Sequence, residues 1–143
     1  MFTFILQQME SSFILTQVNR VYKRAAGPLY LERNLNLTIL LDEAHFEMLK
    51  RGQQNQAQDM FDKLTSLVIN KTFHTVQGFY TINQSLHHLV VEGQVEDYDK
   101  KVRLQRNFTN MGAEFLARRL QMRYEELKPV YDLPEIEWLV IEK

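Results

Sequence analysis

The residues best suited to chemistry lie in one short string, Leu37–His45, in which an apolar run leads directly into Asp42, Glu43 and His45. Adjacent carboxylates and an imidazole are groups that bind divalent cations, activate water or transfer protons. The string also fits a helix, in which Glu43 and His45 diverge because they are two residues apart. On that interpretation Asp42 and Glu43 lie in the first half of the helix, and His45 partly faces solvent.

The string Leu37–His45 resembles the Walker B box of DEAH-type helicases and related RecA-like ATPases. The resemblance covers nine residues and implies that Asp42 contacts magnesium-bound nucleotide and that Glu43 activates the attacking water. The chain lacks the Gly-x-x-x-x-Gly-Lys-Ser/Thr loop that cradles the phosphates in such enzymes. A nucleotide-linked protein that uses residues 42–45 without a phosphate loop is therefore an alternative interpretation. The resemblance also implies a polar sensor at one of three residues, Thr81, Asn83 or Gln84.

The four histidines do not show the spacing of a metal site. A helical site usually carries ligands three or four residues apart, whereas His87 and His88 are adjacent and diverge. His88 and Glu92 form a helical pair, but one pair is not a site. We expect the histidines at the surface or its boundary, and we predict no metal. Because the chain has no cysteine and no Gly-x-Ser-x-Gly elbow, we also predict no catalytic residue, no cofactor and no enzymatic activity.

Basic residues gather in one segment near the C-terminus. Eight of them against three acidic residues give residues 100–128 a charge of +5, whereas the tail from Pro129 carries four acidic residues and Lys143. A basic helix over 100–128 could contact phosphates, which makes a nucleic-acid-binding regulator a second alternative, although nucleic acid is the less favoured partner. It could equally be a solvated face, or could dock the acidic tail. The arginines that we select as partner-binding candidates are Arg118, Arg119 and Arg123.

The C-terminal arm, residues 129–143, differs in pattern from the rest of the chain. Ile136, Trp138 and Val140 alternate with other residues, which is typical of a short strand or an extended arm. Trp138 is the only tryptophan, and tryptophan is a common interface anchor. We predict that Ile136, Trp138 and Val140 bind a partner, or that the arm folds back onto its own domain.

Apolar residues at helical spacing dominate the rest of the chain. They predict helices over 2–26, 36–51, 54–73 and about 79–93, and one long helix over 94–127 that Pro129 ends. Ser11 and Ser12 could divide the first of these into two elements, and the Lys50-Arg51-Gly52 triplet and Gly93 are stop signals.

The predicted fold is mainly α: an antiparallel bundle of four to five helices with a short extended or β-like C-terminal arm. Residues 1–128 form a single helical domain, and the arm packs on it or on a partner. The alternative is an α/β sandwich with strands near 34–41, 76–82 and 136–141.

Length and composition agree with one ordinary globular domain. The chain has 143 residues, 45% of them hydrophobic, and a net charge of -1, which excludes disorder and a wholly basic nucleic-acid coat. Phe2–Leu6 is short and has no basic residue before it, so we expect no secretory leader, no membrane partner and a cytoplasmic location. The leading interpretation of function is a non-enzymatic interaction protein. It would be a small helical adaptor, an assembly factor or a structural subunit of a homo-oligomer, with a protein or its own copy as partner.

Overall fold

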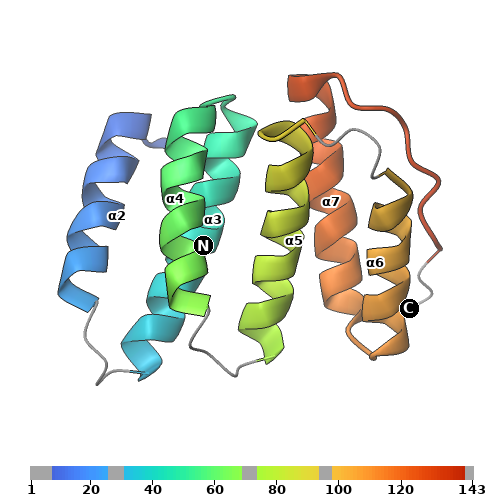
Figure 1. Cartoon of the computed structure of the whole chain (residues 1–143), viewed down its shortest axis with the longest axis horizontal. Coiled ribbons are helices and arrows are strands. Elements are labelled where there is room, and N and C mark those ends of the chain that lie inside the picture. The colour runs from blue at the N-terminus through green and yellow to red at the C-terminus, as the bar shows by residue number, and fades with distance from the viewer. Residues whose placement is uncertain (1–7, 26–30, 69–73, 94–97, 141–143) are drawn as a thin grey trace.

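The protein is mainly helical. The computed structural model describes residues 8–25, 31–68, 74–93 and 98–140, and these contain helices but no strand. Figure 1 shows the six helices labelled in this part of the chain, which are α2 (Ser11–Ala25), α3 (Leu31–Lys50), α4 (Gln54–Val68), α5 (His74–Val90), α6 (Tyr98–Asn110) and α7 (Glu114–Tyr131).

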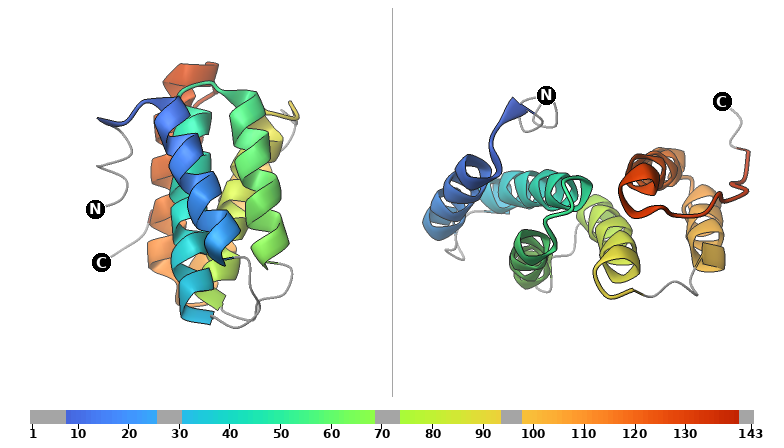
Figure 2. Two further views of the ribbon diagram at one scale, coloured as in Figure 1. Left: turned by 90° about the vertical axis from the view of Figure 1, so that its left-hand side faces the viewer. Right: turned by 90° about the horizontal axis from the view of Figure 1, so that it is seen from above.

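The helices stand side by side, with α2 and α6 at opposite ends of the row (Figure 1). Successive helices reverse direction, as expected for short connections in a bundle. Helix α3 packs against α2, α4, α5 and α7, and α5 contacts α3, α4 and α7, while α6 packs on α7. Seen from above, the bundle is a flattened array with α3 and α5 near its middle (Figure 2).

Helix α3 lies at the centre of the core. All nine residues from 41 to 49 are buried, which is expected of a helix that has neighbours on all sides. Most of the remaining core comes from the apolar stripes of the other helices. The fully buried large side chains of the whole core include Ile14, Leu37, Leu41, Met48, Met60, Leu64, Ile82, Leu86, Leu120 and Leu127.

Glycines with positive φ follow the ends of three helices. Gly52 comes after α3 and Gly93 after α5, which confirms both predicted stop signals. Gly112 has a φ of 76° and ends α6 in the same way, because glycine adopts this left-handed conformation without a steric penalty. The prediction of one helix over 94–127 is therefore wrong, and the bundle has more helices than the predicted four to five.

Other predicted boundaries also differ from the structure, since α3 begins at Leu31 and α5 at His74, each about five residues earlier than predicted. Helix α2 begins at Ser11, in agreement with the division at Ser11–Ser12, and the part of the predicted helix on residues 1–7 and 26 lies outside the described residues. Pro129 does not end α7, which runs through it to Tyr131. A proline so close to the C-terminus of a helix interrupts only its last turn. The helix stops where Asp132 adopts a left-handed conformation, with a φ of 52°.

The strand interpretation is wrong at its first two segments, because residues 34–41 lie within α3 and residues 76–82 within α5. Burial on several sides explains the error, since a helix that is apolar all round loses the clean period that separates it from a buried strand. Residues 133–140 form no strand either, and residue 141 lies outside the described residues. The C-terminal arm is extended here but is not shown to be β-like.

Candidate functional site

The two residues most suggestive of chemistry, Asp42 and Glu43, are buried against arginines of α7. Arg123 forms a bidentate ion pair with the Asp42 carboxylate: Nη1 donates to Oδ1 at 3.1 Å and Nη2 to Oδ2 at 2.9 Å. Arg119 donates from Nη2 to Asp42 Oδ2 at 2.6 Å and to Glu43 Oε1 at 2.6 Å. Arg119 and Arg123 are four residues apart, so they leave α7 on one face and meet the same two acids.

Helix α5 completes this network through Asn83. Its Nδ2 donates to the backbone carbonyl of Asp42 at 3.0 Å, and its Oδ1 accepts from Arg123 Nη1. Asp42 is 0% exposed and Arg123 is 3% exposed. Because two carboxylates face two guanidinium groups, the buried charges balance. We call Asp42, Glu43, Asn83, Arg119 and Arg123 the polar network.

Aromatic rings cover the two guanidinium groups. The Arg119 guanidinium carbon lies 4.5 Å from the centre of the Phe79 ring, and that of Arg123 lies 4.5 Å from the centre of the Phe46 ring. Stacking of this kind favours arginine over lysine, because the guanidinium is planar and weakly hydrated. The polar network is therefore packed as part of the core, where it fixes how α3, α5 and α7 fit together.

The geometry differs from the arrangement that the helicase resemblance implies. The whole string Leu37–His45 lies inside α3, and no strand end presents Asp42 or Glu43 to a ligand. A magnesium ion at Asp42 would have to displace both arginines that already contact it. Of the three sensor candidates, only Asn83 approaches Asp42, whereas the Thr81 hydroxyl bonds its own helix at Gln77 O and Gln84 lines a separate surface hollow between α5 and α6.

A chain of side-chain hydrogen bonds crosses the interface of α3, α4 and α5. Gln58 donates from Nε2 to Asp62 Oδ1 at 2.9 Å, so its Oε1 faces His87 Nε2, also at 2.9 Å. His87 Nε2 therefore carries a proton, and its Nδ1 accepts from His45 Nε2 at 2.9 Å. This order leaves His45 Nδ1 as a buried acceptor with no hydrogen-bond partner among the described residues.

Burial keeps both imidazoles of this chain neutral. It lowers the pKa of His45 well below its usual value, and the neighbouring His87 acts in the same direction. Burial likewise lowers the pKa of His87 to about 4. The expectation that the histidines lie at the surface or its boundary is therefore wrong for His45 and His87. It fails because they occupy apolar stripes of α3 and α5, where a neutral ring packs well.

The predicted pair of His88 and Glu92 is present, with His88 Nε2 on α5 3.9 Å from Oε1 of Glu92, which lies just past the end of that helix. Within the described ranges, no three His, Asp or Glu side chains are grouped so that they could hold a metal ion. The His74 side chain lies outside the described residues.

The basic segment 100–128 is divided between α6 and α7, and its charges point in different directions. Arg119 and Arg123 point inward to the polar network, and Lys101 is buried with its Nζ 3.2 Å from Ser85 O. Lys128 pairs with Glu125 and Glu135. The basic side chains that remain exposed are Lys100, Arg103, Arg106 and Arg118.

The C-terminal arm packs on its own helices. Trp138 meets Tyr124 edge to face, with the ring centres 5.5 Å apart, and donates from Nε1 to Glu125 Oε1 at 3.1 Å. Gln105 of α6 accepts from Leu139 N at 2.8 Å and donates to Leu139 O at 3.2 Å. Ile136 also packs against the core.

Val140, by contrast, is 90% exposed. Of the predicted partner-binding residues, Arg118 and Val140 are thus exposed, while Ile136, Trp138, Arg119 and Arg123 make internal contacts.

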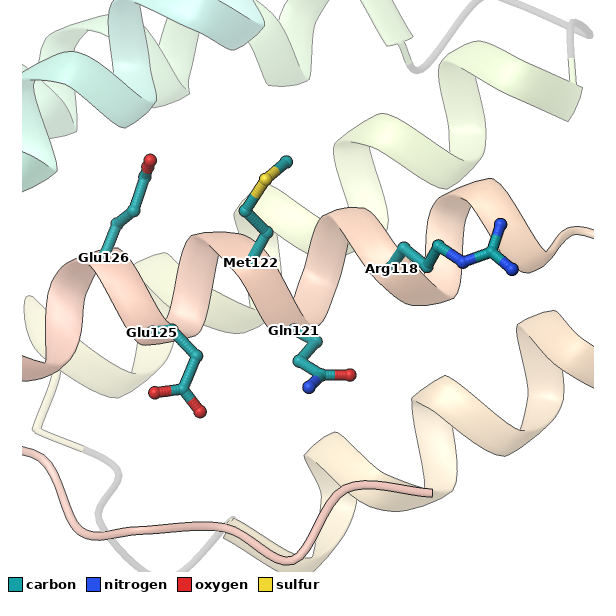
Figure 3. A pocket seen from close by; sticks show the side chains of 5 residues that line it. All are labelled: Arg118, Gln121, Met122, Glu125 and Glu126. Atoms are coloured by element: carbon teal, nitrogen blue, oxygen red, sulfur yellow. The ribbon is translucent and has the colours of Figure 1, made fainter. Parts of the chain in front are cut away.

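The outer face of α7 carries a shallow hollow that sequence reasoning missed. Arg118, Gln121, Met122, Glu125 and Glu126 line it, and its volume is about 700 Å³. Figure 3 shows Met122 and Glu126 projecting to one side of the helix and Gln121 and Glu125 to the other. Met122 is 58% exposed and does not contribute to the core.

The sequence contains signals of the buried polar network. Arg123 lies three residues after Leu120 and four before Leu127, and Asp42 lies next to Leu41 in α3. A charged residue at a core position of an amphipathic helix implies a buried partner, because an uncompensated charge there is costly. The identity of the partner could not be predicted, since Asp42 and Arg123 are far apart in the chain.

Comparison with known proteins does not assign a role to these residues. The chain matches no family model, no curated protein and no solved structure. Among the helices of the described residues, none has the length and apolar character needed to cross a membrane. Function must therefore be inferred from the contacts and surfaces of the chain itself.

Proposed function

We propose that this chain is a non-enzymatic protein–protein interaction protein, in the sense of a helical adaptor, an assembly factor or a structural oligomer subunit. The observation that carries the proposal is the contrast between its interior and the outer face of α7. The acids and arginines of the interior pair with one another and the buried histidines bond each other, whereas α7 presents large apolar side chains to solvent. Phe115 is 54% exposed and Met122 is 58% exposed.

This outer face has the composition of a contact surface. Phe115, Met122 and Val130 are exposed apolar residues on α7, and Arg118 and Glu126 lie between them. Single exposed apolar residues are common on protein surfaces, but contiguous patches rimmed by polar groups mark interaction sites. Phenylalanine, methionine and arginine are also enriched at interfaces.

The two alternatives have less support. A nucleotide-linked function would require Asp42 to exchange its arginine partners for a magnesium ion, and titration calorimetry with magnesium-ATP tests it directly. A nucleic-acid-binding function would rest on the four exposed basic side chains of α6 and α7, and it predicts an affinity that falls steeply with salt.

Site-specific photo-crosslinking in cells tests the interaction function. A photoreactive amino acid at position 122 should give discrete crosslinked products, whereas the same residue at position 59, on the exposed surface of α4, should give few. Equal and diffuse labelling from the two positions would refute the proposal.

A further inference from the structure

We infer that the partner at the outer face of α7 is a second copy of this chain, bound with its own α7 antiparallel about a two-fold axis near Met122. This inference rests on the proposed function and adds the identity of the partner. It is carried by the order of side chains along one face of α7, which is Phe115, Arg118, Met122, Glu126 and Val130.

That face is complementary to itself. Arg118 lies four residues before Met122 and Glu126 four residues after it, so the two charges are placed symmetrically and have opposite signs. Each lies about 6 Å along the helix axis from Met122, given a rise of 1.5 Å per residue. A two-fold axis at Met122 therefore brings Arg118 of each copy opposite Glu126 of the other, as a self-complementary interface requires.

The same axis pairs the apolar ends. Phe115 lies seven residues before Met122 and Val130 eight residues after it, so Phe115 of one copy faces Val130 of the other. Packed helices are 8–10 Å apart, a separation that these side chains span. The hollow of about 700 Å³, which Met122 helps to line, would receive the Met122 side chain of the second copy.

The charges on α7 favour an antiparallel over a parallel arrangement of the two α7 helices. In a parallel arrangement Arg118 would face Arg118 and Glu126 would face Glu126, and both contacts would be repulsive. Within the described part of the chain, Arg118 and Glu126 have no ion-pair partner, although Arg119, Arg123, Glu125 and Lys128 on the same helix all have one. Within the described residues, Glu114 at the start of α7 also has no ion-pair partner, so the antiparallel contact would pair two of the three unpaired charges of this helix.

Charge reversal in the full chain provides the test. Sedimentation velocity at low salt should show a dimer that dissociates on dilution. Arg118→Glu and Glu126→Arg should each raise the dissociation constant at least tenfold, because each creates two like-charge contacts. The double variant should return to within about threefold of the native value, and an equimolar mixture of the two single variants should form a heterodimer. Arg103→Glu, at an exposed position of α6, is the matched control and should leave the dissociation constant of the dimer unchanged.

A disulfide gives an independent measurement, because the native chain has no cysteine. Met122→Cys should oxidise to a covalent dimer, whereas Asp59→Cys on α4 should not. A chain that remains monomeric at all concentrations, or a double variant that does not recover, would overturn the inference.

The crosslinking experiment at position 122 separates this inference from the proposed function. A crosslink to a second copy of the chain supports both. A crosslink to a different protein keeps the proposed function but overturns the self-association. Unspecific labelling, equal to that from position 59, contradicts both.

Discussion

Asp42 is the residue on which the polar network depends, since it receives both Arg119 and Arg123 while fully buried. Asp42→Asn removes one charge of a balanced set and leaves the guanidinium groups undercompensated. We expect a loss of about 3–5 kcal/mol in the free energy of unfolding, the range found when one partner of a buried pair is removed. Urea denaturation measures it.

Asp59 is the matched control for Asp42. Its pair with Lys63, at 2.7 Å, lies on the surface of α4 with the Asp59 side chain half exposed. Asp59→Asn should change the free energy of unfolding by no more than about 1 kcal/mol. Similar losses at the two positions would contradict the structural role of the polar network.

The buried pair His45 and His87 makes stability depend on pH. Well above pH 6.5 both imidazoles are neutral in the folded and unfolded chains, so the pair's contribution to stability is complete. Below pH 6.5 the unfolded chain binds protons, whereas burial holds the pKa of His87 at about 4 and the pKa of His45 well below its usual value in the folded chain. Unfolding then takes up protons, and the free energy of unfolding falls as pH decreases from 6.5 to 4.

Denaturation at pH 7 and pH 5 measures this effect. The double variant His45→Gln/His87→Gln should lose less stability between the two values than the native chain loses. If the double variant retained the full pH dependence, other groups would have to cause it.

The sequence identifies some residues of the candidate site but not their partners. Asp42, Glu43 and His45 attract attention because they follow an apolar run, and that run is a buried helix. Whether such residues are reactive or internally paired depends on α7 and α5, which contribute Arg123 and His87 from distant parts of the sequence. Local spacing carries no information about those long-range partners.

At the scale of elements, Gly112 separates α6 from α7. Nothing lies within 4 Å of a Cβ built at this position, so a substitution there meets only the backbone penalty of its positive φ. Gly112→Val should lower the free energy of unfolding by about 1–2 kcal/mol, whereas Gly112→Asn should cost less, because asparagine tolerates the left-handed region. Thermal unfolding compares the stability of the two variants. Equal losses of stability would show that the turn does not require a left-handed residue at position 112.

The Gly112 turn also shows why one long helix was expected. Leu104, Phe108, Met111 and Phe115 continue at helical spacing across it. Phe108 is buried, but Met111 and Phe115 are exposed, so the apparent stripe continues past the end of the helix by coincidence. The C-terminal ends of α3 and α5 were predictable because Gly52 and Gly93 follow them with positive φ.

The C-terminal arm is held by Gln105, whose amide makes two hydrogen bonds to the backbone of Leu139. Gln105→Ala removes both, at about 1 kcal/mol each, and should release the arm. Because Trp138 is the only tryptophan, its emission should shift to the red and acrylamide should quench it more strongly. Arg106→Ala, at the exposed neighbouring position, should leave the fluorescence unchanged. Native fluorescence in Gln105→Ala would show that the contacts of Trp138 suffice to hold the arm.

At the scale of the whole molecule, the bundle is organised around α3. The polar network joins α3 to α5 and α7, and the histidine chain joins α3 to α4 and α5. The two sets of buried polar contacts therefore fix all four central helices relative to one another. Hydrophobic packing alone tolerates small shifts of helices, whereas hydrogen bonds and ion pairs in a core do not, because a misplaced partner is left unsatisfied.

Stability should consequently fall from the middle of the bundle to its ends. Helix α2 packs mainly on α3 and α6 mainly on α7, whereas α3 has four neighbouring helices. Amide hydrogen exchange under native conditions should therefore be slowest at residues 41–49 and about a hundredfold faster in α2 and α6, because end helices can open without disrupting the central contacts. In the Asp42→Asn variant the protection of α3 should fall toward that of the end helices. Uniform protection across α2, α3 and α6 would show instead that the bundle opens only as one unit.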